Sequence, residues 1–152
     1  MEKQDIPNKT RTGQCLCGAV KFIAKDTPDT FSTCYCKDCQ RWVGGAYHGM
    51  PVPTEKLEIT GRDHIHVYNS SDFAERASCR KCGAALWWRL TKTKYFGKTS
   101  IPVGLLDDTS GLTLNHELFT DYKNNTNEIP KGVEGMTSTE VAALIATFGD
   151  EQ

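Results

Sequence analysis

The cysteines constrain this chain more than any other feature. Its seven cysteines fall into three short clusters: Cys15 and Cys17; Cys34, Cys36 and Cys39; and Cys79 and Cys82. Thiolates this close together are usually metal ligands, and soft sulfur suits zinc. An odd number of cysteines argues against a framework made only of disulfides. Four thiolates complete a tetrahedral shell and three leave one position open, so the sequence predicts a structural zinc and a reactive zinc.

Length and composition indicate one domain without a membrane or nucleic-acid role. The chain has 152 residues, of which 38% are hydrophobic, and a net charge of -1. We expect a single domain over residues 1–152, with residues 1–11 as a polar, mobile leader. That leader lacks the apolar core of a secretory signal, and no apolar run approaches the ~20 residues of a membrane span. A cytoplasmic protein is therefore predicted, and its dispersed charges do not form a nucleic-acid footprint.

Short alternating segments indicate a mainly β fold with little helix. Val20, Phe22 and Ala24 alternate with more polar neighbours, which is typical of a strand. The same reading predicts strands at residues 31–35, 46–52, 56–60, 64–68, 73–78, 84–90 and 95–100, and leaves 112–119 ambiguous. Residues 37–43 are expected to form one or two helical turns. A C-terminal helix is predicted at 137–149, where Thr137 or Ser138 caps an apolar face.

The outer cysteine pairs predict a staple between distant parts of the chain. Cys15-Leu16-Cys17 in extended backbone would place both sulfurs on one face, because side chains alternate with a period of two. Cys79-Arg80-Lys81-Cys82-Gly83 has the form of a zinc knuckle. Together they would close a four-thiolate site, which contributes directly to folding energy.

The central Cys34-Tyr35-Cys36-Lys37-Asp38-Cys39 predicts a site with an open coordination position. Zinc held by three thiolates lowers the pKa of whatever occupies the fourth position, and a thiolate held there is a nucleophile for a small carbonyl carbon. One alternative is a second structural zinc completed by His48. Another is a redox dithiol, but the strand–C-x-x-C–helix context of such motifs is missing.

The cysteine segments resemble a known enzyme family. Gly13-Gln14-Cys15-Leu16-Cys17-Gly18-Ala19-Val20, Cys34 to Arg41, Cys79 to Gly83 and Val103 to Asp108 are similar to segments of the glutathione-dependent formaldehyde-activating enzymes. The resemblance covers about residues 11–120 and places all seven cysteines at family positions, although Tyr35 stands where the family often has histidine.

That resemblance implies both a fold and a reaction. The implied fold is mainly β, with zinc-stapled antiparallel sheets of the Mss4-like β-tent type. The implied reaction is that of a carbon–sulfur lyase, which joins glutathione and formaldehyde into S-(hydroxymethyl)glutathione and cleaves it again. By position, two zinc ions are implied: a structural one on Cys15, Cys17, Cys79 and Cys82, and a catalytic one on Cys34, Cys36 and Cys39.

Substrate-binding residues are less clearly marked. The cations that we expect to bind the carboxylates of a glutathione-like thiol are Arg41, Lys37 and Lys98. Gly44 and Gly45 are expected to line the approach to the reactive zinc, where backbone without side chains lets a ligand come close. Two other readings stay open: the same lyase chemistry on a different thiol, and a non-catalytic zinc module that binds a partner.

Overall fold

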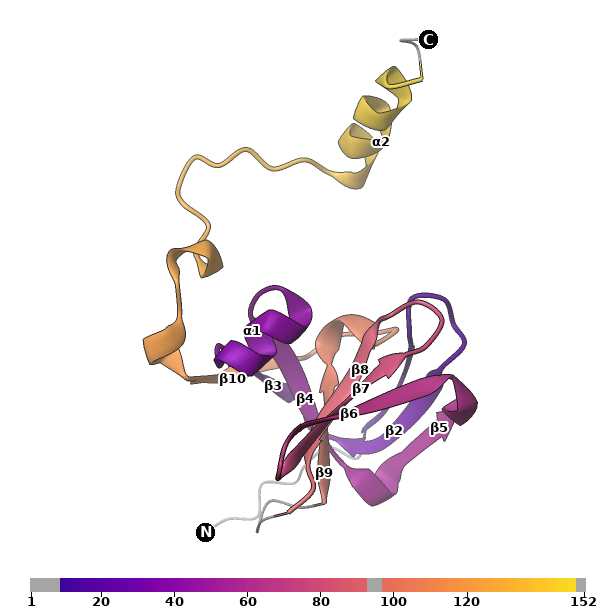
Figure 1. Cartoon of the computed structure of the whole chain (residues 1–152). Coiled ribbons are helices and arrows are strands. Elements are labelled where there is room, and N and C mark those ends of the chain that lie inside the picture. The colour runs from indigo at the N-terminus through magenta and orange to yellow at the C-terminus, as the bar shows by residue number, and fades with distance from the viewer. Residues whose placement is uncertain (1–8, 93–96, 150–152) are drawn as a thin grey trace.

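The computed structural model describes residues 9–92 and 97–149, which form two β-sheets, two α-helices and five short 3-10 helices (Figure 1). The strands are β1 (Lys9–Gln14), β2 (Lys21–Thr27), β3 (Thr30–Cys34), β4 (Tyr47–Pro53), β5 (Leu57–Thr60), β6 (Ile65–Ser71), β7 (Ala74–Cys79), β8 (Ala85–Leu90), β9 (Lys98–Pro102) and β10 (Thr113–Leu118). The α-helices are α1 (Lys37–Val43) and α2 (Ser138–Thr147). The 3-10 helices are η1 (Thr54–Lys56), η2 (Arg62–His64), η3 (Val103–Leu105), η4 (Thr120–Tyr122) and η5 (Asn125–Asn127). The prediction of a mainly β protein is confirmed.

The strands form a three-stranded sheet in the order β1-β2-β5 and a seven-stranded sheet in the order β10-β3-β4-β9-β8-β7-β6. The pairs are antiparallel as expected, with one difference: β10 runs parallel to β3, with Leu118 opposite Cys34. This pairing brings a segment about 80 residues later in the chain to the strand that leads into the central cysteines.

The main core lies between the two sheets. Phe22 and Ala24 of β2 are buried against Met50, Val52 and Ile101 of the larger sheet. The alternation seen in the sequence thus marks the inner face of β2, as its period of two requires. Trp87 is buried in the neighbouring cluster with Cys15 and Cys79, whereas Trp88 points to the other face, toward Cys34 and Cys39.

Two local predictions are wrong. Residues 9–11 are not a mobile leader, because they form the start of β1. Arg11 is only 4% exposed, and its guanidinium donates to Asp29 and to the carbonyl oxygens of Asp108 and Ser110. Residues 1–8 lie outside the described part of the chain.

The second wrong prediction concerns the Cys15–Cys17 segment, which is a turn rather than a strand. Gly18 has a φ of 78°, and its N–H donates to the Cys15 carbonyl oxygen, which reverses the chain between β1 and β2.

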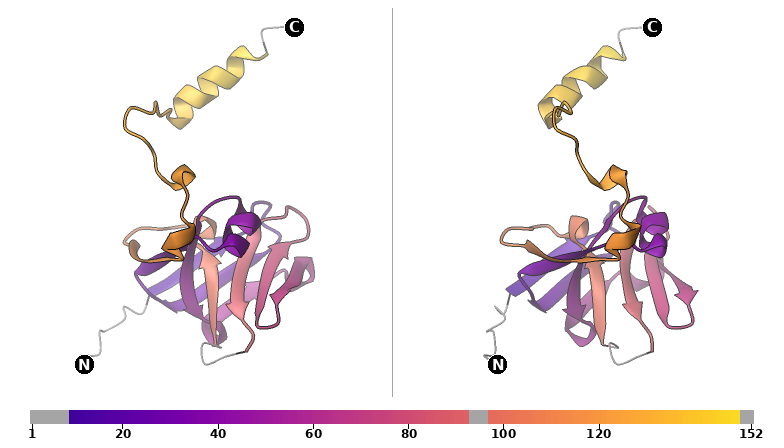
Figure 2. Two further views of the ribbon diagram at one scale, coloured as in Figure 1. Left: turned by 60° about the vertical axis from the view of Figure 1, so that its left-hand side comes forward. Right: turned by 90° about the vertical axis from the view of Figure 1, so that its left-hand side faces the viewer.

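The two α-helices sit in different surroundings. The helical turns predicted at 37–43 are confirmed as α1, which ends at Gly44 in the left-handed region. The predicted C-terminal helix is confirmed as α2, where Thr137 and Glu140 form a capping box. Figure 2 shows α2 standing away from the sheets, and none of its residues is buried. No described helix is long and apolar enough to cross a membrane. The predicted strand at 95–100 is seen from Lys98, since 93–96 are not described.

Candidate active site

The outer cysteine pairs come together in one cluster. The sulfurs of Cys15, Cys17, Cys79 and Cys82 all lie within 4.8 Å of one another. The Cys15 and Cys17 sulfurs are 3.6 Å apart, and those of Cys17 and Cys79 are 3.8 Å apart. Four thiolates at about 2.3 Å from one zinc ion stand about 3.8 Å apart in a tetrahedron, so these four sulfurs fit zinc.

Backbone N–H groups surround this four-cysteine cluster. The N–H of Val20 donates to the Cys15 sulfur at 3.3 Å, and the N–H of Gly83 donates to the Cys79 carbonyl oxygen at 2.9 Å, which closes the predicted knuckle. A hydrogen bond from the Ala84 backbone is the largest cause that lowers the pKa of Cys82, to about 6. The knuckle therefore favours the thiolate, the form that binds metal.

The central cysteines form a second cluster at the junction of β3 and α1. Cys34 ends β3, Cys36 is the N-cap of α1, and Cys39 lies in the first turn of the helix, so the strand–C-x-x-C–helix context that we expected to be missing is present. Their sulfurs lie within 4.8 Å of one another, and the Cys39 N–H donates to the Cys36 sulfur at 3.3 Å. Three converging sulfurs suit zinc and leave one coordination position for another ligand. We call Cys34, Cys36 and Cys39 the triplet.

The pKa values of two thiols of the triplet are shifted in opposite directions. A hydrogen bond with Cys39 is the largest cause that lowers the pKa of Cys34, to about 6, and Arg76 adds to this shift through its charge. The same hydrogen bond, followed by burial, raises the pKa of Cys39. Cys34 is thus the thiol of this pair that is a thiolate at neutral pH.

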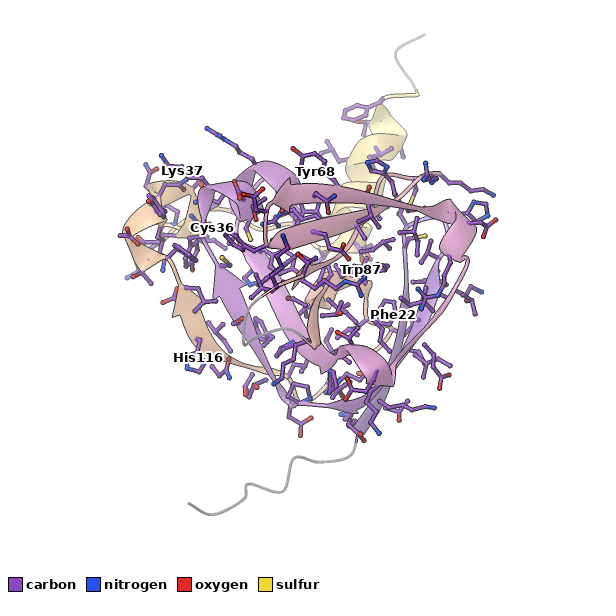
Figure 3. The ribbon with its side chains drawn as sticks, turned by 60° about the horizontal axis from the view of Figure 1, so that its bottom comes forward. Phe22, Cys36, Lys37, Tyr68, Trp87 and His116 are labelled. Carbon is purple, nitrogen blue, oxygen red and sulfur yellow. The ribbon has the colours of Figure 1, made fainter. Side chains whose placement is uncertain are left out.

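The triplet opens into a cavity of about 420 Å³. Its walls come from α1, the β6–β7 hairpin, β8 and the segment that follows β10. Besides the triplet, the lining residues are Lys37, Asp38, Ser70, Ser71, Phe73, Ala74, Arg76, Trp88, Leu90, Leu118, Phe119 and Tyr122. Figure 3 shows Cys36 and Lys37 together at the start of α1, on a different side of the molecule from Phe22 of the smaller sheet. The triplet therefore faces a space of ligand size, as a reactive site requires.

Arg76 is a site residue that the sequence did not reveal. Both of its Nη atoms lie 3.7 Å from the Cys39 sulfur, and its guanidinium stacks 4.8 Å from the centre of the Trp42 ring. In the sequence of β7, nothing distinguishes Arg76 from a cation on the protein surface. The register shows its position, because Arg76 pairs with Trp88 on the sheet face that looks toward the triplet. Its positive charge beside a thiolate stabilises the charged sulfur.

The segment after β10 is fixed over α1 by polar contacts. The Tyr35 hydroxyl donates to Glu117 at 2.6 Å, and Lys123 donates to the same carboxylate at 3.0 Å. These contacts lower the pKa of Glu117, with the Tyr35 hydrogen bond as the largest cause. The Gln40 side-chain amide donates to the Tyr35 and Tyr122 carbonyl oxygens. One wall of the cavity is thereby anchored to the helix that carries the triplet.

The residues predicted to bind substrate are scattered. Lys37 lines the cavity, but Arg41, Gly44, Gly45 and Lys98 are not among its lining residues. Arg41 faces a neighbouring hollow of about 280 Å³ together with Lys37 and Gln40, and Gly44 caps the far end of α1. Roles for Arg41, Gly44 and Gly45 in binding stay predictions.

His48 does not complete the triplet. It lies on the opposite face of β4 from Tyr47, which packs on the triplet, and its Nδ1 is 2.7 Å from the Thr33 hydroxyl. The alternative of a structural zinc closed by His48 therefore has no geometric support among the described residues.

Comparison with known proteins adds three findings. The sequence model of the glutathione-dependent formaldehyde-activating enzyme family matches residues 10–122. An uncharacterized lyase of Schizosaccharomyces pombe is 28% identical over 135 residues, which are 88% of this chain and 95% of that protein. The crystal structure of a Rhodobacter sphaeroides protein has a TM-score of 0.51 and 21% identity, over 63% of this chain and 87% of that one. This last likeness concerns the fold alone.

Proposed function

The chain belongs to the glutathione-dependent formaldehyde-activating enzyme family, and we propose that it is a zinc-dependent carbon–sulfur lyase acting on thiol–aldehyde adducts. A lyase-like function holds at the level of the family and of the Schizosaccharomyces pombe relative. Glutathione and formaldehyde are the first substrates to test. The proposal further includes two zinc ions and a cytoplasmic location, which suits a chain whose seven cysteines are all free thiols.

The observation that carries this proposal is the triplet at the edge of the large cavity. Cys34, Cys36 and Cys39 offer three sulfurs to one metal, and all three also line the space in which a ligand would sit. The four-cysteine cluster supplies a full set of ligands and contributes no residue to that cavity. Of the two cysteine clusters in the described residues, the triplet is thus the one that combines a metal-binding set with an open coordination position and access for a substrate.

Chain residues prepare the triplet for this chemistry. Zinc bound here would supply Lewis acidity and would favour the thiolate form of a thiol substrate near neutral pH. The Cys39 N–H orients the Cys36 sulfur, while Arg76 favours the thiolate of Cys34 through its charge and would offset the charge of Cys39 once a metal displaces its proton. Lys37 at the cavity wall offers a cation to a substrate carboxylate.

Exchange spectroscopy tests the proposal directly. Glutathione and formaldehyde equilibrate with their adduct without help, so the measurement is the enzyme-dependent increase in the exchange rate by NMR. We expect acceleration by the zinc-loaded protein and none by a Cys36→Ser variant whose four-cysteine cluster still holds its metal. An unaccelerated exchange with every thiol and aldehyde tried, in protein carrying two zinc ions, would contradict the lyase assignment.

One feature favours a second candidate, a non-catalytic zinc module that binds a partner. Val141, Leu144, Ile145 and Phe148 of α2 and its C-terminal cap expose apolar side chains well away from the sheets. Such a helix is suited to a groove on another protein. Thermal stability with a panel of thiols separates the two candidates, because a thiol that binds the folded chain must raise its melting temperature.

A further inference from the structure

The cavity beside the triplet is more apolar than a formaldehyde adduct requires. Formaldehyde brings no apolar group into this space of about 420 Å³, and the thiol half of the adduct is a polar tripeptide. The remaining wall is built largely from apolar side chains: Phe73, Trp88, Leu90, Leu118 and Phe119. We call these five residues the apolar wall. Apolar surface facing a cavity favours a ligand that covers it with apolar atoms of its own.

Phe119 is held in this wall at a conformational cost. Its φ is 58° and its ψ is 48°, the left-handed region that bulky side chains rarely adopt. The hydrogen bond from the Tyr122 N–H to its carbonyl oxygen and the stacking of the two rings, with centroids 6.2 Å apart, keep it there. Strain of this kind persists where the surroundings enforce it, and it is concentrated at ligand sites. Phe119 as a residue is 53% exposed, so burial does not explain its placement.

The charges at the cavity also favour a ligand that is bound mainly through apolar contacts. Glutathione carries two carboxylates, and the cations among the described lining residues are Lys37 and Arg76. Arg76 is already engaged, with both Nη atoms at Cys39 and its guanidinium on Trp42. Lys37 lies 5.5 Å from the centre of the Tyr122 ring, at the α1 side of the cavity. Apart from one carboxylate at Lys37, recognition falls mainly on apolar contacts.

We propose that the adduct handled by this site carries an aromatic group on the former carbonyl carbon or one carbon away from it, so that the aldehyde half is an aryl or arylalkyl aldehyde rather than formaldehyde. The inference rests on the proposed lyase function and narrows its substrate class. In the forward direction the thiol sulfur bonds to the carbonyl carbon, the C=O π bond opens, and the thiol proton ends on the former carbonyl oxygen. Cleavage reverses each of these changes. The apolar wall holds the aromatic group while the triplet faces the sulfur.

Unreactive thioethers test the binding preference apart from catalysis. S-benzylglutathione places an aromatic group one carbon from sulfur, and S-methylglutathione has only that carbon. One extra methylene in a hydrophobic pocket is worth about 10- to 200-fold in discrimination, so we expect S-benzylglutathione to bind at least about tenfold tighter by calorimetry.

Phe119→Gly is the decisive variant. Glycine adopts a φ of 58° without strain, so the variant should unfold at the same temperature as the parent or a higher one while losing most of the benzyl preference. Phe148→Ala is the matched control. It removes an aromatic ring of comparable exposure, 65%, from the end of α2, away from the cavity, and should leave the preference unchanged.

The possible outcomes separate the inference from the proposed function. Equal affinities for the two thioethers, or a benzyl preference that survives Phe119→Gly, overturn the aromatic substrate class even if exchange of glutathione with formaldehyde is accelerated. If neither thioether binds, the inference also falls, and the formaldehyde exchange measurement decides whether the lyase function falls with it. Faster exchange with phenylacetaldehyde than with formaldehyde, at equal adduct concentration, supports the inference.

Discussion

The two cysteine clusters use the same ligand chemistry in opposite structural settings. The four-cysteine cluster joins the β1–β2 turn to the knuckle between β7 and β8, so its ligands come from chain segments about 60 residues apart. The triplet draws all its ligands from residues 34–39 and lies at a cavity. A metal that cross-links distant segments stabilises the fold, whereas one held by a short loop links little of the chain and is free to serve a ligand. The two clusters should therefore fail in different ways.

Cys79→Ser should have the largest effect. It removes one sulfur from the staple between two distant segments, and loss of a structural metal is among the few changes that cost more than about 4 kcal/mol. We expect aggregated protein, or an unfolding midpoint far below that of the parent in urea. Elemental analysis should show loss of zinc from this cluster. A Cys79→Ser protein with parental stability would mean that the cluster does not staple the fold.

Cys36→Ser is the counterpart in the triplet and should affect activity far more than stability. The three ligands close a short loop, so losing their metal should cost about 1–3 kcal/mol of unfolding free energy, the common range for a single substitution. Thiol binding and exchange should fall to background. Unfolding as severe as that of Cys79→Ser would make the triplet structural, and full thiol-dependent activity in a folded variant would remove its catalytic role.

Arg76→Met tests how a residue outside the triplet supports the triplet, without changing the four-cysteine cluster. The substitution keeps a long side chain on Trp42 but removes the positive charge beside Cys39. Loss of such outer contacts typically costs 10- to 100-fold in metal affinity or activity, and we expect faster release of one of two zinc ions to a chelator. Arg76→Lys should recover part of the effect. The matched control is Arg89→Met, since Arg89 pairs with Glu75 outside this cavity. Parental zinc release from Arg76→Met would show that Arg76 does not act through the triplet.

The smallest effect is expected in thiol labelling after mild chelation. We expect the metal of the triplet, which three sulfurs would hold instead of four, to leave first, so iodoacetamide should label Cys34 while Cys82 stays protected until the protein unfolds. The hydrogen bond from Cys39 lowers the pKa of Cys34 to about 6, so labelling should rise with pH around that value, as the thiol becomes a thiolate. Folding lowers the pKa of Cys34, so ionisation of this thiol stabilises the folded protein at high pH. That stabilisation is lost as pH falls through about 6. Mass spectrometry of labelled peptides gives both results. Labelling of Cys82 before Cys34 would show that the four-cysteine cluster, not the triplet, releases its metal first.

The features of the fold and the site that can be predicted from the sequence are those that depend on the spacing of residues close together in the chain. Cysteine spacing identified both clusters, and the alternation around Phe22 identified the inner face of β2. The prediction of extended backbone at Cys15–Cys17 is wrong because the alternation of side chains continues past Gly18 and favours a strand. The turn depends instead on the positive φ of Gly18. Arg76 and Phe119 could not be placed at the cavity, since their positions follow from the β7–β8 register and from the parallel pairing of β10 with β3. Arg41 is predicted to bind a substrate carboxylate because its guanidinium suits that group, but it faces the neighbouring hollow.

The parallel pairing of β10 with β3 has a consequence for the order in which the protein is made. Phe119 follows Cys36 by about 80 residues, and ribosomes add about 5–20 residues per second, so the triplet exists for roughly 4–16 s before the last residues of the apolar wall are synthesised. During this interval its thiols meet the cellular metal and oxidant pools without the complete wall of the finished cavity. Metal capture by the nascent chain would protect these thiols, which makes zinc supply during translation a determinant of how much active protein a cell obtains.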